Sequence, residues 1–204
     1  KPTVPTAHPI VYSICNWGLF APWKWAPAAG GNYWRTTPDI FDTWKGGNPF
    51  MMSVMKILKR QNRILQYGKP GQWNDPDMLI VGNYGKGNAT SWKGKFKGMS
   101  DLEYQSHMSL WAMMNAPLLA SCDLRKMNLQ TRHILLNAEV LAINQNELFE
   151  PTQLIEKRNG VWVYLKTGRD FTALAVFNSS GKPQGKSCNL AQIAALKNNL
   201  LKDF

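Results

Sequence analysis

The segment SDLEYQSHMSLWAMMNAPLLASC, residues 100–122, predicts a helix that leads directly into a short strand. Ser100 followed three positions later by Glu103 is the pattern of a capping box, which marks where a helix begins. Pro117 predicts the end of the helix, because proline cannot donate the backbone hydrogen bond that continues it. The apolar run at residues 118–122 has the length of a buried strand. A helix followed by a buried strand is the repeating unit of a parallel α/β sheet.

The same alternation of strands and helices extends over most of the chain. Residues 10–15, IVYSIC, are apolar and β-branched and predict a buried strand, and residues 50–66 have the apolar spacing of a helix. Further extended segments and short helices are expected at residues 32–40, 72–83, 129–137 and 138–144. The predicted fold class is therefore α/β with a parallel sheet.

The pattern changes after Glu150. From there the apolar residues alternate with period two, and the turn sequences RNG and TGRD separate the alternating runs, as in antiparallel hairpins. We therefore expect an α/β part over residues 1–148 and an antiparallel β part over residues 149–204.

The chain of 204 residues carries a net charge of +11, which raises the question of nucleic-acid binding. Its lysines are scattered, without zinc-ligand spacing or an RNA-binding aromatic motif, and only a loose group stands out, at Lys86, Lys93, Lys95 and Lys97. We expect a solvated basic surface and no nucleic-acid partner. No apolar run approaches the length of about 18 residues that spans a bilayer, so no membrane partner is expected either.

The ends and the cysteines leave the cellular compartment open. The opening residues KPTVP contain neither an initiator methionine nor the apolar region of a signal peptide, so we expect a removed upstream segment or a piece of a longer chain. The 3 cysteines, Cys15, Cys122 and Cys188, form no CxxC pair. Their spacing does not decide the redox compartment, and secretion or the periplasm stay among the alternatives.

Polar and aromatic side chains gather just after the predicted strands. They are Asn16 and Trp17, Arg35 and Asp39, residues 74–77, and Asp123. Because the carboxyl ends of parallel strands meet at one edge of a sheet, we expect these side chains to share one pocket. Tryptophan offers a flat apolar face that suits a sugar ring, and a minority of the 9 tryptophans is expected to serve this purpose. The sequence therefore favours a polyhydroxylated ligand.

Asp39 has two interpretations. One is a cap at the start of a helix, where a carboxylate interacts favourably with the helix dipole. The other is a catalytic carboxylate, for which the turn sequence NDPD offers Asp75 or Asp77 as a partner. Two carboxylates beside aromatic platforms favour glycoside hydrolysis, in which one carboxyl is held protonated and the other ionised.

Other chemistries lack their signatures. No serine lies in a G-x-S-x-G elbow and no glycine-rich nucleotide fingerprint occurs, so no cofactor is expected. The 3 histidines, at positions 8, 107 and 133, have no metal-ligand spacing, and no metal is expected. His107 is interpreted as a residue on a helix face.

Several stretches together resemble a known family. SICNWG, YWRTTPDI, GQWNDPDMLIVGN, LWAMMNAPLLASCDLR and LNAEVLAINQ occur in the order found in the α-galactosidases of glycoside hydrolase family 27, over about residues 10–150. The resemblance implies a (β/α)8 TIM barrel followed by an antiparallel β-sandwich domain. It also implies a retaining exo-glycosidase that removes terminal α-galactose with two aspartates.

The resemblance assigns roles to single positions. Asp39 matches the general acid/base of the family, and Arg35 matches an arginine that helps to hold sugar hydroxyls. Cys15, Asn16 and Trp17 match a strand-end motif, usually Cys-Glu-Trp, that contacts the sugar near its 2-hydroxyl.

The turn sequence NDPD, residues 74–77, is the second acidic turn after the one at Asp39, and its residues match two different roles. Asp77 and Met78 match positions that line the substrate pocket, whereas Asn74 and Asp75 match positions that brace the loop. The resemblance therefore places the catalytic partner of Asp39 upstream and not at either of these aspartates.

One departure from the family pattern concerns the sugar. Asn16 stands where many members have glutamate, so it keeps an acceptor and gains a donor but loses the charge. The bulky Leu19 favours a free 2-hydroxyl and hence galactose. An α-N-acetylgalactosaminidase, a β-L-arabinopyranosidase and an isomalto-dextranase of the same family stay as alternatives.

The other departure concerns the nucleophile. The family carries it in a Tyr-x-Lys-Tyr-Asp type of motif on the fourth barrel strand, and no such motif occurs in this sequence. The predicted fold is thus a partial TIM barrel, strands 5–8, followed by an incomplete antiparallel β-sandwich domain. Its partners would be terminal galactosides and the missing N-terminal half of the barrel, and the chain alone is expected to be inactive. A non-catalytic sugar-binding remnant is a further alternative, and the family implies a disulfide between Cys15 and the missing fourth strand.

Overall fold

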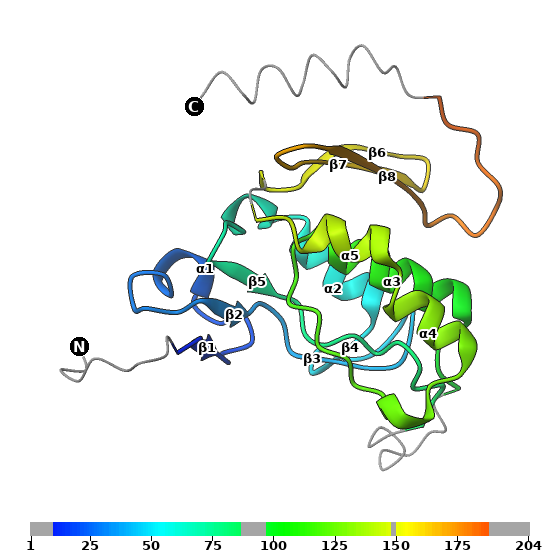
Figure 1. The fold of residues 1–204 in the computed structure, drawn as a ribbon, viewed down its shortest axis with the longest axis horizontal. Helices are drawn as coiled ribbons and strands as arrows, with labels where there is room; N and C mark the ends of the chain where they lie inside the picture. Colours follow the sequence, from blue (N-terminus) through cyan, green and yellow to red (C-terminus); the bar gives the residue numbers. More distant parts are fainter. Residues whose placement is uncertain (1–9, 87–96, 148–149, 188–204) are drawn as a thin grey trace.

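The computed structural model describes residues 10–86, 97–147 and 150–187. Among the residues singled out above, His8, Lys93, Lys95 and Cys188 lie outside these ranges. Figure 1 shows a group of helices with short strands along one side and a 3-stranded sheet along the other. The chain is therefore mixed α/β, as the alternation of strands and helices predicts.

The N-terminal strands are parallel, as predicted. The 3-stranded sheet runs in the order β1-β2-β5 and consists of β1 (Ser13–Ile14), β2 (Tyr33–Arg35) and β5 (Trp73–Asp75). A second parallel pair is formed by β3 (Asp39–Ile40) and β4 (Met51–Met52). Within the described residues these strands form open sheets and not a closed barrel.

The helices begin where side chains can cap them. The helices and 3-10 turns are α1 (Pro22–Trp25), α2 (Val54–Gln61), η1 (Leu65–Tyr67), α3 (Asp101–Met113), η3 (Leu124–Lys126), α4 (Leu129–Leu135) and α5 (Ala138–Asn144). Side chains of Ser53, Asn128 and Asn137 accept hydrogen bonds from first-turn N–H groups of α2, α4 and α5. The capping box of Ser100 and Glu103 is confirmed at the start of α3.

The buried strand predicted at residues 10–15 is wrong in both length and burial. Only Ser13 and Ile14 form a strand, and the apolar side chains before them are exposed, with Ile10 at 77% and Val11 at 67%. The reason is that β1 is the edge of an open sheet, so nothing among the described residues covers these side chains.

Two other predicted elements need correction. Residues 118–122 form only an isolated parallel bridge, between Leu79 and Ala120. It consists of two backbone hydrogen bonds, from the Leu79 N–H to the Leu119 carbonyl and from the Ser121 N–H to the Leu79 carbonyl. The helix predicted over residues 50–66 is shorter, since Met51 and Met52 pair with β3 and the cap at Ser53 delays its start to Val54.

The antiparallel sheet follows as predicted. Its strands are β6 (Gln153–Arg158), β7 (Val161–Thr167) and β8 (Thr172–Asn178), in the order β6-β7-β8. Asn159 and Gly160 between the first two strands have positive φ angles of 50° and 78°, which a tight hairpin turn requires. The central strand β7 is buried along its whole length.

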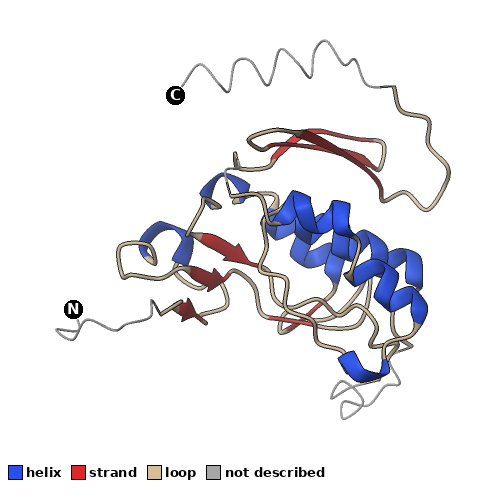
Figure 2. Cartoon of the chain, in the orientation of Figure 1, coloured by secondary structure: helices blue, strands red, loops and turns tan. Residues whose placement is uncertain are grey.

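One core joins the two parts of the molecule. Trp162 and Tyr164 of β7 belong to the same buried cluster as Ile57 and Leu58 of α2. The Tyr164 hydroxyl also donates to Asn62 Oδ1 at 3.1 Å. Figure 2 shows the consequence, with the strands of this sheet lying over the layer of helices. No helix within the described ranges has both the length and the apolar character to cross a membrane.

Candidate active site

The candidate site lies at the carboxyl ends of two neighbouring strands. β2 ends at Arg35 and β5 ends at Asp75, and these two residues are paired in the parallel register. The chain continues in contact beyond this pair, because both the N–H and the hydroxyl of Thr36 donate to the Asp75 carbonyl at 2.9 Å. Gln61 of α2 donates in turn to the Thr36 hydroxyl. The loop that carries Asp39 is therefore tied to the end of β5.

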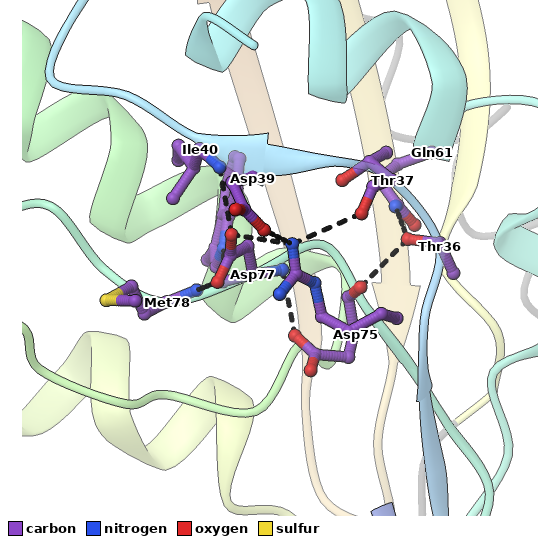
Figure 3. A network of polar contacts seen from close by, with 10 residues as sticks. Thr36, Thr37, Asp39, Ile40, Gln61, Asp75, Asp77 and Met78 are labelled. Atoms are coloured by element: carbon purple, nitrogen blue, oxygen red, sulfur yellow. Dashed lines mark hydrogen bonds and ion pairs between the residues drawn. The ribbon is translucent and has the colours of Figure 1, made fainter. Parts of the chain in front are cut away.

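Arg35 connects two carboxylates of very different exposure. Its Nη2 lies 3.0 Å from Asp39 Oδ1 and 2.7 Å from Asp77 Oδ2. The side chain of Asp39 is 54% exposed, whereas those of Arg35 and Asp77 are 13% and 7% exposed. Figure 3 shows the carboxylates of Asp39 and Asp77 side by side in this network. Of the pair, Asp39 is the carboxylate that a ligand can reach.

Asp39 does not cap a helix, so that interpretation is wrong. It is the first residue of β3 and pairs with Met51 of β4. The next residue, Ile40, donates its N–H to Asp77 Oδ2 at 2.8 Å, which holds the start of the strand against the second acidic turn. A distant carboxylate therefore positions the backbone on which Asp39 sits.

Asp77 is the anchor of the network. Its backbone has a φ of 87°, which is rare for a residue other than glycine, and its N–H donates to Asp75 Oδ1 at 2.8 Å. Its carbonyl accepts from the Trp111 indole, and its Oδ1 accepts from the Met78 N–H, both at 2.8 Å. Burial raises the pKa of Asp77, and the N–H of Ile40 and the charge of Arg35 oppose this shift.

Asp75 is a buried acid with a brace-like role. Its side chain accepts the Asp77 N–H, and its neighbour Asn74 accepts from the Trp34 indole at 3.0 Å. Burial raises the pKa of Asp75 from 3.8 to about 6, against the opposing effects of the Asp77 N–H and the charge of Arg35. At neutral pH the ionised Asp75 carboxylate therefore lowers the stability of the folded protein.

We predict that Asp75→Asn stabilises the protein above pH 7. Because the pKa of Asp75 is raised in the folded state, its favourable contribution is present below about pH 4 and is lost as the pH rises through about 6. Asparagine keeps an oxygen acceptor for the Asp77 N–H without the buried charge. Urea unfolding should show a gain of about 1–3 kcal/mol at pH 8 and none at pH 4. The exposed Asp170→Asn serves as the control, and an equal gain at both pH values would contradict the argument.

The loop after β1 reaches the same edge of the sheet. Gly18 donates its N–H to the Arg35 carbonyl at 2.9 Å, and a Cβ at Gly18 would lie 2.2 Å from the Thr36 oxygen. Trp17 also has a positive φ, 57°, and is 40% exposed. The tight backbone approach, which glycine permits, thus brings residues 15–18 beside Arg35.

The polar groups of this loop are only partly used. Asn16 donates from Nδ2 to the Leu19 carbonyl at 2.8 Å, and its buried Oδ1 has no hydrogen-bond partner within the described part of the chain. Cys15 is exposed and forms no disulfide with another cysteine among the described residues. Asn16 therefore keeps a buried, unsatisfied acceptor on the loop beside Arg35.

The structure gathers the predicted site residues into two groups. Arg35, Asp39, Asp77 and Met78 form one hydrogen-bonded network, with Met78 41% exposed at its margin. Cys15, Asn16 and Trp17 lie on the neighbouring loop, which the Gly18 backbone ties to Arg35. Across the described residues, no three His, Cys, Asp or Glu side chains converge in the manner of metal ligands.

A cavity of about 350 Å³ lies at the opposite end of the sheet. It is lined by Tyr33 and Trp73, the first residues of β2 and β5, and by Asn115 and Asn144. Arg35 and Asp75 are the last residues of the same strands, so this cavity is separate from the acidic network.

Helix α3 contributes two contacts to the site that the sequence patterns above do not indicate. The indole of Trp111 holds the Asp77 carbonyl, and His107 Nε2 accepts from the Ile80 N–H at 3.1 Å. The available signal was the spacing of four residues between these two aromatic rings, which places them on one face of a helix.

Comparison with known proteins places this geometry in a family. The model of the family described as Alpha galactosidase A, Melibiase_2, matches residues 3–146. The "Probable alpha-galactosidase" of Dictyostelium discoideum is 38% identical over 87% of this chain and 42% of its own length. The α-galactosidase of Oryza sativa subsp. japonica is 41% identical over 76% of this chain and 32% of its own length.

A solved structure agrees with these similarities. The crystal structure of α-galactosidase I from Mortierella vinacea superposes with a TM-score of 0.74 at 29% sequence identity. The match covers 84% of this chain and 43% of that protein. The chain therefore spans less than half the length of the proteins it matches.

Proposed function

Because the chain belongs to the Alpha galactosidase A family, we propose that it supplies the acid/base half of a retaining α-galactosidase active site. The substrate would be a terminal α-D-galactosyl residue of an oligosaccharide or glycoconjugate. The nucleophilic aspartate lies outside these 204 residues in this proposal, on the half of the barrel that completes the site.

The observation that carries the proposal is the asymmetric pair of carboxylates around Arg35. Asp39 is exposed and oriented, whereas Asp77 is buried and fully engaged in hydrogen bonds. Asp39 can therefore protonate the leaving oxygen in the first displacement and deprotonate water in the second. Asp77 is a wall and anchor of the pocket in this scheme.

Arg35 and the loop after β1 would hold the sugar. The buried Nε of Arg35 has no partner within the described ranges, and Asn16 Oδ1 has none either. The exposed face of Trp17 would offer an apolar platform for the sugar ring. Leu19, 60% exposed on the same loop, would disfavour an acetamido group at the 2-position, which supports galactose as the sugar.

The architecture proposed for the whole enzyme follows from the strand order. β1, β2 and β5 and the bridge at Ala120 would be strands 5–8 of a (β/α)8 barrel, within a catalytic part at residues 1–148. Residues 149–204 would begin the C-terminal antiparallel β-sandwich domain. The exposed apolar side chains before β1 would be covered by the N-terminal half of the barrel.

The test is an assay of the complete enzyme on a panel of aryl glycosides. We expect the aryl α-galactoside to be hydrolysed fastest, with NMR showing that the first sugar released keeps the α configuration. Fastest turnover of an α-N-acetylgalactosaminide, a β-L-arabinopyranoside or an isomaltoside would replace galactose by that sugar. Release of the β anomer would overturn the double-displacement mechanism.

The 204-residue chain by itself should show no turnover of an aryl α-galactoside. A retaining mechanism needs a second carboxylate about 5–5.5 Å from the acid/base, free to attack the sugar, and Asp77 is buried and hydrogen-bonded. The matched control is the Asp39→Asn form of the same chain, which should give the same background rate. Turnover above that background would contradict the proposal, and galactose binding without turnover by the complete enzyme would favour a sugar-binding remnant.

A further inference from the structure

Helix α3 makes two directional contacts with the turn that carries the acidic anchor. Trp111 donates its indole N–H to the Asp77 carbonyl at 2.8 Å. One helical turn earlier, His107 Nε2 accepts the Ile80 N–H at 3.1 Å. Both side chains are fully buried, and their rings meet edge to face with centroids 4.1 Å apart. The aromatic pair is therefore hydrogen-bonded to the backbone at both ends of residues 77–80.

The turn needs such support because its backbone is strained. Asp77 has a φ of 87°, a conformation that costs energy for a residue with a side chain and persists only where the surroundings enforce it. If its carbonyl lost the indole donor, Asp77 would lose a contact that holds this conformation, and rotation about its N–Cα bond would be free to bring φ back to an ordinary value. The Asp77 carboxylate would then leave its present position.

That displacement would reach Asp39 by two routes, through Ile40 and through Arg35. Asp77 Oδ2 accepts both the Ile40 N–H, at 2.8 Å, and the Arg35 guanidinium, at 2.7 Å. Ile40 follows Asp39 in the chain, and the same Nη2 of Arg35 binds Asp39 Oδ1. Movement of the Asp77 carboxylate therefore changes both the backbone and the charged partner of Asp39.

His107 suits this role because it stays neutral. Burial lowers the pKa of His107 to about 3, with a backbone contact to Met78 opposing part of the shift. A neutral imidazole has one acceptor nitrogen, and the Ile80 N–H occupies it.

We propose that Trp111 and His107 are positioning residues for Asp39, acting through the Asp77–Ile80 turn. The inference rests on the proposed acid/base role of Asp39. The inference goes beyond packing. A tryptophan that only fills the core could lose its N–H without an effect on catalysis, whereas a tryptophan that positions Asp39 needs the N–H to hold the Asp77 carbonyl.

The first experiment compares Trp111→Phe with Trp34→Phe in the complete enzyme. Both tryptophans are fully buried and donate one indole hydrogen bond, but Trp34 donates to the side chain of Asn74, whereas Trp111 donates to the backbone carbonyl of Asp77. The measurement is kcat on galactosides with poor alkyl leaving groups and on those with activated aryl leaving groups, corrected for the folded fraction. Trp111→Phe should lower kcat about tenfold or more on poor leaving groups and about threefold or less on activated ones. Trp34→Phe should leave the ratio of the two rates unchanged.

A second pair of variants keeps the test decisive if Trp111→Phe fails to fold. His107→Gln keeps an acceptor for the Ile80 N–H, whereas His107→Leu removes it. His107→Leu should shift the rate ratio in the same direction as Trp111→Phe, and His107→Gln should restore it. A crystal structure of either loss variant should show a lengthened Arg35–Asp77 contact.

The outcomes separate this inference from the proposed function. If the complete enzyme has no glycosidase activity, or if Asp39→Asn leaves the rate ratio unchanged, the proposed function fails. If Asp39→Asn changes the ratio but Trp111→Phe and His107→Leu do not, only the positioning role is overturned. An unchanged Asp77 backbone in the variant crystal structure would overturn it as well.

Discussion

Asp39→Asn in the complete enzyme is expected to lower turnover of galactosides with poor leaving groups by about a hundredfold to ten-thousandfold. Such leaving groups need a proton as the glycosidic bond breaks, and asparagine cannot provide it. Activated aryl leaving groups depart without a proton, so their first step should be much less affected. The geometry supports this expectation, because Asp39 is the exposed carboxylate of the network and Arg35 orients it at 3.0 Å.

The measurement is steady-state and burst kinetics over a series of leaving groups. On activated substrates, Asp39→Asn should accumulate the glycosyl-enzyme, because the water that releases it has lost its base. Azide attacks without a base and should restore turnover by forming a glycosyl azide. Asp170→Asn, on an exposed turn of the antiparallel sheet, is the matched control and should behave as the parent. Equal losses on all leaving groups, without azide rescue, would argue against the acid/base role.

Arg35→Met is expected to lower both activity and stability. The Arg35–Asp77 pair is largely buried, with side-chain exposures of 13% and 7%, so the variant leaves the Asp77 carboxylate without its cation. Removing one partner of a buried ion pair costs about 3–5 kcal/mol. The same change releases Asp39 and removes a ligand for sugar hydroxyls, so kcat/KM should fall by about a hundredfold or more.

A double-mutant cycle checks this second prediction. Asp77→Asn combined with Arg35→Met removes the unpaired charge and should recover part of the lost stability in urea unfolding, but not the activity. Arg35→Lys is the conservative control, and because an ammonium lacks the planar fork it should retain only part of the activity. Strictly additive losses in the double variant would show that the two side chains are not coupled.

Local signals predicted the elements that local chemistry decides. The capping box at Ser100, the helices α4 and α5, and the hairpin turn at Asn159 depend on residues within a few positions of one another, and all are confirmed. The buried strand at residues 10–15 and the strand at residues 118–122 were wrong. An apolar pattern indicates which side chains of a segment can be buried. It does not show whether a neighbouring element is present to cover them.

The candidate site divides in the same way. The sequence patterns are enough to identify the family, the parallel α/β class and the acidic candidates at positions 39, 75 and 77. The folded chain places Asp39 at the start of a strand, open to a ligand, and buries Asp77 as the anchor of Arg35. Local patterns cannot show this, because exposure and pairing depend on segments about 40 residues apart meeting at one edge of the sheet, where Ile40 and Arg35 share the carboxylate of Asp77.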